Sequence, residues 1–273
     1  PAKQPDQLRV QASHLCVENG LLPLLPDVLF DLQAGLLHHL LYPSRVYPAV
    51  RNELCDGQSC HLPPYGVKAG NSNSLRGIVY DEVNDQIIFG VGNGSPWNRE
   101  FRDPSGGDNL FLSSIVAVDA ETGAYKWHFQ TTPGDNWDYT ATQTIILADL
   151  PVGEDGEARR VAMQAPKNGF FYVLDAESGE FISGDAFVPM NWAEGLDENG
   201  RPIEIADARY GAVPYEQLPG PLGAHNWHPM AFNPDLNLAY IPAQEIPQAY
   251  ARDPRFETQP VGWNTGADFS AGV

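Results

Sequence analysis

Cysteine is scarce in this chain of 273 residues, which holds only three. Three cysteines cannot all pair with one another, and Cys55-x4-Cys60-His61 is two residues too long for the CxxCH pattern that attaches haem. A zinc site would need further ligands in ordered spacing, so a Cys55–Cys60 disulfide or a chance occurrence is the simpler interpretation. We therefore predict neither a haem site nor a zinc site at these cysteines.

Long apolar runs are also missing. The Leu-rich stretch 21–41 is interrupted by Pro, Asp, Gln and His, so we expect no membrane-spanning helix there, although part of it fits a buried helix. The first residues, PAKQPDQLRV, have no initiator Met, no basic-then-apolar pattern and no small-residue cleavage site. No secretory signal is visible, and the sequence reads as mature or truncated.

Basic residues become rare after residue 76. Residues 1–76 carry six basic and six acidic side chains, whereas residues 77–273 carry ten basic and twenty-nine acidic ones, which accounts for the net charge of −19. All six Trp lie in the second part, and all three Cys lie in the first. The composition thus divides the chain near residue 76. Because an acidic body repels phosphate backbones, we expect no nucleic-acid partner and favour a small ligand.

An internal repeat is the clearest sign of architecture. The segment IVAVDAETG at 115–123 returns as FYVLDAESG at 171–179, 56 residues later, and looser copies occur at 78–89 and 230–241. In each, apolar β-formers lead into a polar turn and a second apolar run follows, which is typical of an antiparallel hairpin. The repeats favour the four-stranded blades of a β-propeller. An ordinary β-sandwich with D-x-x-T-G turns fits the strand pattern as well.

Three polar side chains follow or precede apolar strands and could face one pocket. Asn93 comes directly after the strand 87–91, Asp138 closes the loop PGDNWD, and Lys167 lies between the apolar run 161–163 and the strand 170–174. The ordinary structural interpretations are a turn Asn, an Asp in a solvated turn or helix cap, and a solvated surface Lys. Their chemistry also suits a site: calcium prefers neutral and anionic oxygens together, and an ionised carboxylate can act as a general base.

Four segments, taken in order, resemble the quinoprotein alcohol dehydrogenases, in which pyrroloquinoline quinone (PQQ) and calcium oxidise alcohols inside a β-propeller. They are GNGSPWN at 92–98, TTPGDNWDYT at 131–140, QAPKNGFFYV at 164–173 and GAHNWHP at 223–229. The resemblance covers about residues 77–244 and continues weakly beyond. It implies an all-β fold in which 77–273 supply about four blades of an eight-bladed quinoprotein β-propeller, with 1–76 as an unassigned segment.

The same resemblance implies a role for each site residue. Asn93 matches a calcium ligand, and Asp138 matches the catalytic base that also binds the metal. Lys167 matches a basic residue placed against the quinone oxygens, where it would support developing negative charge. Asn226 and Trp227 match positions that contact PQQ or border the substrate cavity.

Other residues of these segments are expected to act differently. Lanthanide-dependent relatives carry an extra carboxylate two residues after the base, whereas Thr140 is neutral here, so the resemblance favours calcium. Asp135 is expected to shape the loop. His225 and His228 form a pair with no third ligand in register, so structural roles are expected for both.

The N-terminal segment departs from the family pattern. Neither the acidic calcium ligand, nor the adjacent cysteine pair, nor the Trp that should flank PQQ is visible in 1–76, and Leu75 stands where that Trp is expected. We read 1–76 as a truncated, fused or mistranslated segment, and the chain as a partial sequence.

The function implied by the resemblance is the oxidation of primary alcohols to aldehydes in the periplasm by hydride transfer to PQQ. Electrons would pass to a cytochrome c-type acceptor, either on a further domain or on a separate protein. The alternative is a non-catalytic β-propeller scaffold or ligand-binding module, in which Asn93, Asp138, Lys167 and Asn226 would have no reason to converge.

Overall fold

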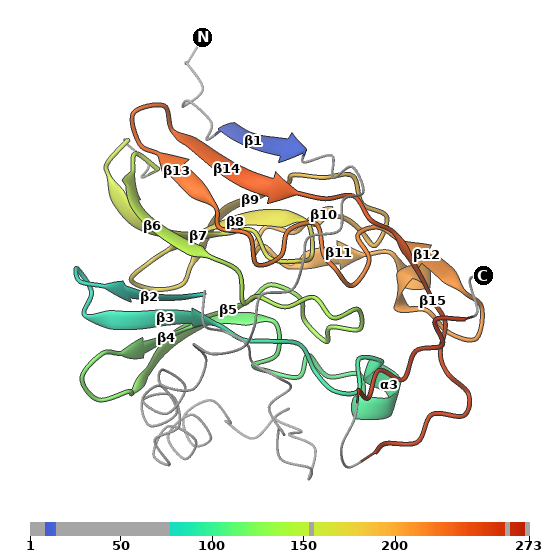
Figure 1. Cartoon of the computed structure of the whole chain (residues 1–273). Coiled ribbons are helices and arrows are strands. Elements are labelled where there is room, and N and C mark those ends of the chain that lie inside the picture. The colour runs from blue at the N-terminus through green and yellow to red at the C-terminus, as the bar shows by residue number, and fades with distance from the viewer. Residues whose placement is uncertain (1–8, 15–76, 153–155, 260–262, 271–273) are drawn as a thin grey trace, which may run out of the picture.

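The computed structural model describes residues 9–14, 77–152, 156–259 and 263–270 (Figure 1). These residues form two four-stranded sheets, one three-stranded sheet and two two-stranded sheets. The described helices are short: the α-helix α3 spans Arg99–Arg102 and the 3-10 helix η1 spans Ala206–Arg209. The fold is thus almost entirely β, as the sequence predicts. No helix in the described ranges is long and apolar enough to cross a membrane.

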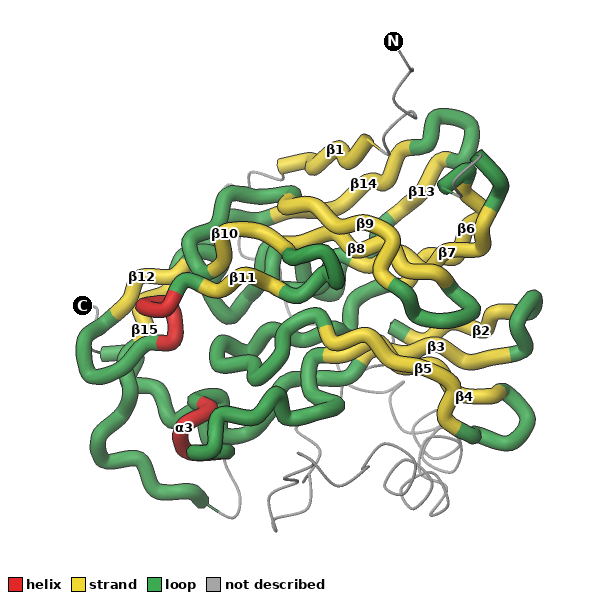
Figure 2. The backbone as a smooth tube through the Cα atoms, turned by 180° about the vertical axis from the view of Figure 1, so that it is seen from behind, coloured by secondary structure: helices red, strands yellow, loops and turns green. Residues whose placement is uncertain are grey.

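The two four-stranded sheets are antiparallel meanders, each with the strand order of the chain. The first consists of β2 (Ile78–Asp81), β3 (Gln86–Gly90), β4 (Ser114–Asp119) and β5 (Tyr125–Gln130). The second consists of β6 (Ile145–Leu150), β7 (Arg159–Gln164), β8 (Phe170–Asp175) and β9 (Phe181–Ala186). Seen from behind, the two sheets lie one above the other, with loops between them (Figure 2). They are consecutive propeller blades.

The sequence repeat marks the same place in both blades, the turn between the third and fourth strands. Oδ1 of Asp119 accepts hydrogen bonds from the backbone N–H and the hydroxyl of Thr122, and Oδ1 of Asp175 does the same for Ser178. Gly123 and Gly179 close these turns with φ of 70° and 76°, a left-handed conformation that glycine adopts without steric cost. The 56-residue period is therefore one blade.

The second blade's turn packs directly on the first blade. The indole N–H of Trp127 on β5 donates to the carbonyl of Ala176 at 3.1 Å, and the side-chain amide of Gln86 donates to the same oxygen. A Cβ added at Gly179 would lie 2.5 Å from the Trp127 ring, so the turn touches the indole face. Trp97 and Trp127 are both buried in the main core.

A third sheet stands beyond the second blade. It pairs β13 (Ala231–Asn233) with β14 (Leu238–Ala243), and β1 (Arg9–His14) lies parallel to β14 along its other edge (Figure 1). The hairpins at 78–89 and 115–130 share one sheet. The sequence predicts about four blades. The described ranges contain two complete blades and a hairpin of a third, because two of the predicted hairpins belong to one blade.

Two small ribbons complete the described strands. One pairs β10 (Ala193–Leu196) with β11 (Pro202–Glu204), and the other pairs β12 (Tyr215–Gln217) with β15 (Gln248–Tyr250). The long segment between the second blade and β13 thus carries structure of its own. Trp192, near the start of this segment, is fully buried against Trp137 and Tyr139 of the loop between β5 and β6. This contact packs the start of the segment between β9 and β13 against the loop between β5 and β6. The Leu-rich stretch 21–41, the cysteines and Leu75 lie outside the described residues.

Candidate active site

The three predicted side chains emerge at one edge of the blades. Asn93 follows β3, the loop with Asp138 follows β5, and Lys167 follows β7. In an antiparallel sheet, alternate strands run in the same direction, so the second and fourth strands of a blade end at the same edge. Because β7 is the second strand of the next blade, its end adjoins that edge too. The backbone N–H of Lys167 donates to the carbonyl of Thr140 at 3.4 Å, which joins the two loops.

The side chains of Lys167 and Asn93 lie near the carboxylate of Asp138. Nζ of Lys167 lies 2.8 Å from Oδ2 of Asp138 in a charged hydrogen bond. The side-chain amide of Asn93 donates to the carbonyl of Gly94 at 3.1 Å, and Asn93 lies close enough to Asp138 to act on the pKa of its carboxyl. The amide, carboxylate and ammonium groups come from three separate loops and two blades. A partly buried ion pair that joins loops of two blades in this way marks a candidate active site.

Burial controls the charge of Asp138. The side chain of Asp138 is 18% exposed and that of Lys167 is 8% exposed. Burial raises the pKa of the Asp138 carboxyl, while the charge and the hydrogen bond of Lys167 and the side chain of Asn93 act to lower it. The carboxylate is therefore held with few water contacts but with a cation beside it. That is a suitable state for a group that accepts a proton.

Asp135 shapes the loop that carries Asp138. Its Oδ1 accepts hydrogen bonds from the backbone N–H of Trp137 at 3.1 Å and of Tyr139 at 3.0 Å. Asp138, between these two amides, adopts a left-handed conformation with φ of 71°. Such a conformation costs a non-glycine residue about 1 kcal/mol or more and persists where its surroundings fix it. Asp135 thus positions Asp138.

The segment with Asn226 packs against Lys167. The backbone N–H of Ala224 donates to the carbonyl of Lys167 at 2.9 Å, and a Cβ added at Gly223 would lie 2.4 Å from Cγ of Lys167. Nδ2 of Asn226 donates to the carbonyl of Leu222, while its Oδ1 is buried without a hydrogen-bond partner among the described residues. Trp227 is 54% exposed. Asn226 therefore offers one free acceptor beside the Lys167 loop.

His225 has a structural place. It is fully buried, and its two ring nitrogens face the carbonyl oxygens of Ala165 and His228 at 2.6 and 2.7 Å. Both ring nitrogens therefore face the backbone, which agrees with a structural role for His225. No three His, Cys, Asp or Glu side chains gather into a metal-binding group in the ranges that the structure describes.

The chemistry of these residues fits PQQ and calcium. The oxygens of Asn93 and Asp138 are a neutral and an anionic ligand of the hard type that Ca²⁺ prefers, and they would supply part of its six to eight ligands. The ammonium group of Lys167 and the free acceptor on Asn226 suit the carboxylates, carbonyls and N–H groups of a polar, flat quinone.

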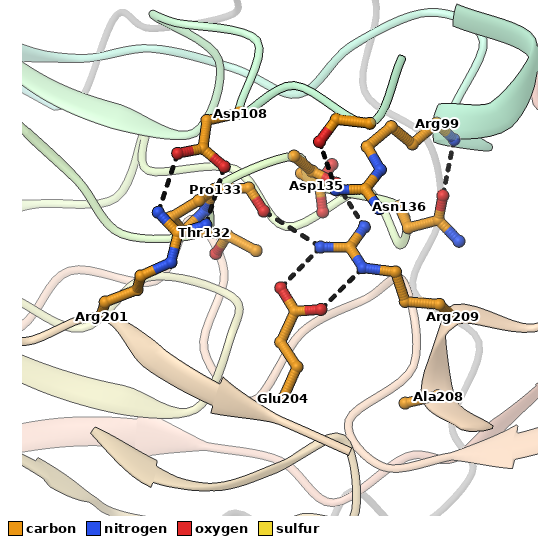
Figure 3. A network of polar contacts seen from close by, with 12 residues as sticks. Arg99, Asp108, Thr132, Pro133, Asp135, Asn136, Arg201, Glu204, Ala208 and Arg209 are labelled. Atoms are coloured by element: carbon orange, nitrogen blue, oxygen red, sulfur yellow. Dashed lines mark hydrogen bonds and ion pairs between the residues drawn. The ribbon is translucent and has the colours of Figure 1, made fainter. Parts of the chain in front are cut away.

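Sequence reasoning missed one set of residues around the site. Arg209, at the end of η1, forms two hydrogen bonds with the carboxylate of Glu204 and two with the carbonyls of Pro133 and Gly134 (Figure 3). Its guanidinium also lies 4.9 Å from the centre of the Trp137 ring. No local sequence pattern predicts the contacts of Arg209 with this loop, because Arg209 lies 75 residues from Gly134 in the sequence.

Comparison with known proteins agrees with the fold. Residues 59–188 match the family model described as PQQ, glucose/ethanol/alcohol dehydrogenase, β-propeller domain. The chain is 50% identical over 211 residues to the quinohemoprotein alcohol dehydrogenase of Comamonas testosteroni. It is 51% identical over 207 residues to the dehydrogenase subunit of the alcohol dehydrogenase (quinone) of Komagataeibacter europaeus. Over about three quarters of its length, the chain is thus similar to the quinoprotein alcohol dehydrogenases.

These relatives are much longer than the chain. The two alignments cover 74% of this chain but only 30% and 28% of the respective relatives. The crystal structure of the Comamonas testosteroni enzyme superposes with a TM-score of 0.68 at 52% identity, over 71% of this chain and 30% of that one. A europium-containing methanol dehydrogenase superposes with a TM-score of 0.65 at 33% identity, over 70% of this chain and 33% of that one. The chain therefore spans about a third or less of the length of these relatives.

Proposed function

We propose that this chain carries the proton-accepting part of the active site of a PQQ- and calcium-dependent dehydrogenase that oxidises primary alcohols to aldehydes. The observation that supports the proposal best is the partly buried ion pair between Asp138 and Lys167, which joins loops of two consecutive blades. The names of the similar proteins, alcohol dehydrogenases from several bacteria, support the substrate class.

Each residue has a defined task in this proposal. Asp138 accepts the proton of the alcohol hydroxyl, and its partly buried position keeps competing water away. Lys167 holds the charge of the reduced cofactor and keeps Asp138 ionised. Asn93 and Asp138 supply oxygen ligands to Ca²⁺, and Asn226 and Trp227 border the cofactor. When bound, PQQ would supply the acceptor for the hydride of the alcohol carbon, and Ca²⁺ would supply a Lewis acid beside it.

Calcium is proposed as the metal because of Thr140. A trivalent ion is favoured by additional negative charge, and the neutral hydroxyl of Thr140 accepts hydrogen bonds from Thr142 and Gln143 two and three residues further on. The periplasm as location, and a cytochrome c-type protein or domain as electron acceptor, complete the proposal. We also propose that 77–273 form the propeller part and that 1–76 are an additional segment, of which β1 adds a strand to the third sheet.

The proposal is tested by adding PQQ and Ca²⁺ to the full chain and measuring dye-linked oxidation of ethanol. Asp138→Asn keeps the shape and removes the proton acceptor, and it should lower kcat by a factor of about 10² to 10⁴. Asp149→Asn is the matched control, because this carboxylate is 63% exposed on β6. Full activity in Asp138→Asn would remove Asp138 as the base. Binding of PQQ without any turnover would favour a ligand-binding module instead.

A further inference from the structure

The backbone carbonyls that lead up to Asp138 are all bound by side chains. Arg209 donates to the carbonyls of Pro133 and Gly134 at 3.2 and 2.6 Å. Arg102 donates to that of Asp135 at 2.5 Å. The next two carbonyls, of Asn136 and Trp137, accept from the hydroxyls of Tyr210 and Tyr250 at 2.9 and 3.0 Å. Five consecutive carbonyls of one loop are thus held by four side chains.

These four side chains come from distant parts of the chain. Arg102 ends α3, Arg209 ends η1 and Tyr210 follows it, while Tyr250 ends β15. Tyr210 and Tyr250 are 1% and 0% exposed and stack on each other with ring centres 5.1 Å apart. Figure 3 shows Arg209 reaching from its own segment to the loop around Asp135. The loop before Asp138 is therefore fixed from several directions at once.

Arg102 also joins the loop to the segment that carries Asn93. The same guanidinium donates to the carbonyls of Pro96 and Trp97, a few residues after Asn93, at 2.6 and 2.8 Å. Its Nε donates to Oδ1 of Asn109. A single arginine therefore sets the spacing between the backbone of the proposed metal ligand and the backbone of the proposed base. A planar guanidinium with five N–H donors is suited to such a junction.

We propose that Arg102, Arg209, Tyr210 and Tyr250 are positioning residues for the reaction, because together they hold the 133–137 backbone so that Asp138 points at Lys167. This inference depends on the proposed function for its catalytic meaning. The structural part of the inference does not depend on the proposed function. The left-handed conformation of Asp138 is maintained by the contacts to the loop carbonyls and by the hydrogen bonds that the Asp135 carboxylate accepts. A base that is fixed before substrate arrives loses no rate to reorganisation.

Conservative tyrosine variants test the structural part. Tyr210→Phe and Tyr250→Phe each remove one hydroxyl and keep the ring. In the full chain, the backbone amides of Trp137 and Tyr139 should then exchange hydrogen about tenfold faster, the factor that corresponds to the usual net contribution of one hydrogen bond. Tyr172→Phe is the matched control: Tyr172 is also 0% exposed, and its hydroxyl donates to the carbonyl of Thr131 outside the loop.

That control carbonyl keeps a second donor, the side-chain amide of Asn168, so the loop should be unaffected by Tyr172→Phe. Equal exchange at residues 137 and 139 in all three variants and the parent chain would overturn the inference, whether or not the chain is an alcohol dehydrogenase. Faster exchange in Tyr172→Phe as well would also overturn it, because the effect would then be general loosening.

Kinetics with PQQ and Ca²⁺ test the catalytic part. Tyr250→Phe should lower kcat about tenfold with little change in the KM for ethanol, because the base is displaced and the substrate contacts remain. Arg102→Lys should lower kcat further, since one ammonium group cannot span all its acceptors. Unchanged kcat together with faster loop exchange would overturn the positioning role. If Asp138→Asn is itself fully active, the proposed function fails while the exchange result still decides the structural part.

Discussion

Nζ of Lys167 lies 2.8 Å from Oδ2 of Asp138, although 29 residues and a change of blade separate them. Both side chains are largely buried, so each charge depends on the other for much of its solvation. Removing one partner of such a pair leaves an uncompensated charge, which is more costly than removing both.

We therefore expect Lys167→Met to weaken PQQ binding by a factor of about 10 to 100, because a charge-assisted contact to the cofactor is lost. It should also lower the free energy of unfolding of the full chain, since the Asp138 carboxylate loses its counter-ion. Fluorescence titration with PQQ and urea unfolding measure the two effects. Lys126→Met is the matched control. Lys126 is exposed, and its ammonium group donates a hydrogen bond to the backbone carbonyl of Asn84 rather than to a carboxylate.

The double variant Lys167→Met with Asp138→Asn separates charge from packing. A neutral amide at 138 needs no counter-ion, so the double variant should be more stable to urea than Lys167→Met alone. Additive losses of stability would mean that the ion pair contributes nothing beyond the contacts of each side chain.

Gly223 is a second sensitive point. Its φ is 77°, and an added Cβ would lie 2.4 Å from Cγ of Lys167. Gly223→Ala should therefore destabilise the chain by about 1–3 kcal/mol and displace Lys167. The comparison is Gly211→Ala, where a Cβ would meet nothing within 4 Å. Equal unfolding midpoints in urea for the two variants would show that the 223–226 segment does not pack on Lys167 as described.

Thr140 provides a test of metal choice. Thr140→Asp adds a carboxylate two residues after Asp138, and we expect it to raise the affinity for Tb³⁺ over that for Ca²⁺ by at least about tenfold, since site charge tunes affinity for hard cations. Tb³⁺ luminescence with Ca²⁺ competition measures the ratio. Asn199→Asp adds the same charge in an exposed turn and should leave the ratio unchanged. An equal rise in the Tb³⁺ to Ca²⁺ affinity ratio in both variants would mean that the added charge acts at long range and that position 140 has no special role.

Asp135 makes the stability depend on pH. Burial raises the pKa of this carboxyl from 3.8 to about 6. Between these values the folded chain binds a proton that the unfolded chain has released, so this group lowers the free energy of unfolding as pH rises from about 4 to about 6. The loss amounts to about 3 kcal/mol at most.

Asp135→Asn cannot titrate, so its unfolding free energy should fall less than that of the parent chain between pH 4 and pH 7. Urea unfolding at both pH values gives the difference in slope between the Asn variant and the parent chain. A parent chain that gains as much stability as the Asn variant over this range would contradict the raised pKa.

Much of the local structure follows from the sequence. The repeated D-A-E-T/S-G turns fix two hairpins because Asp, Ser or Thr and Gly satisfy the same local hydrogen bonds wherever they occur in this order. The apolar strands before Asn93 and Lys167 place both residues at strand ends. The positions of Asn93, Asp138 and Lys167 could thus be predicted as a set from their segments.

The tertiary structure alone decides what surrounds them. That Arg102, Arg209, Tyr210 and Tyr250 hold the carbonyls of one loop has no signal in the sequence, because the contacts join segments tens of residues apart. It also decides that the hairpins at 78–89 and 115–130 share one blade. Neighbouring residues determine the short-range hydrogen bonds and the strand pattern. Blade packing and the burial of Asp138 depend instead on contacts between segments that are distant in the sequence.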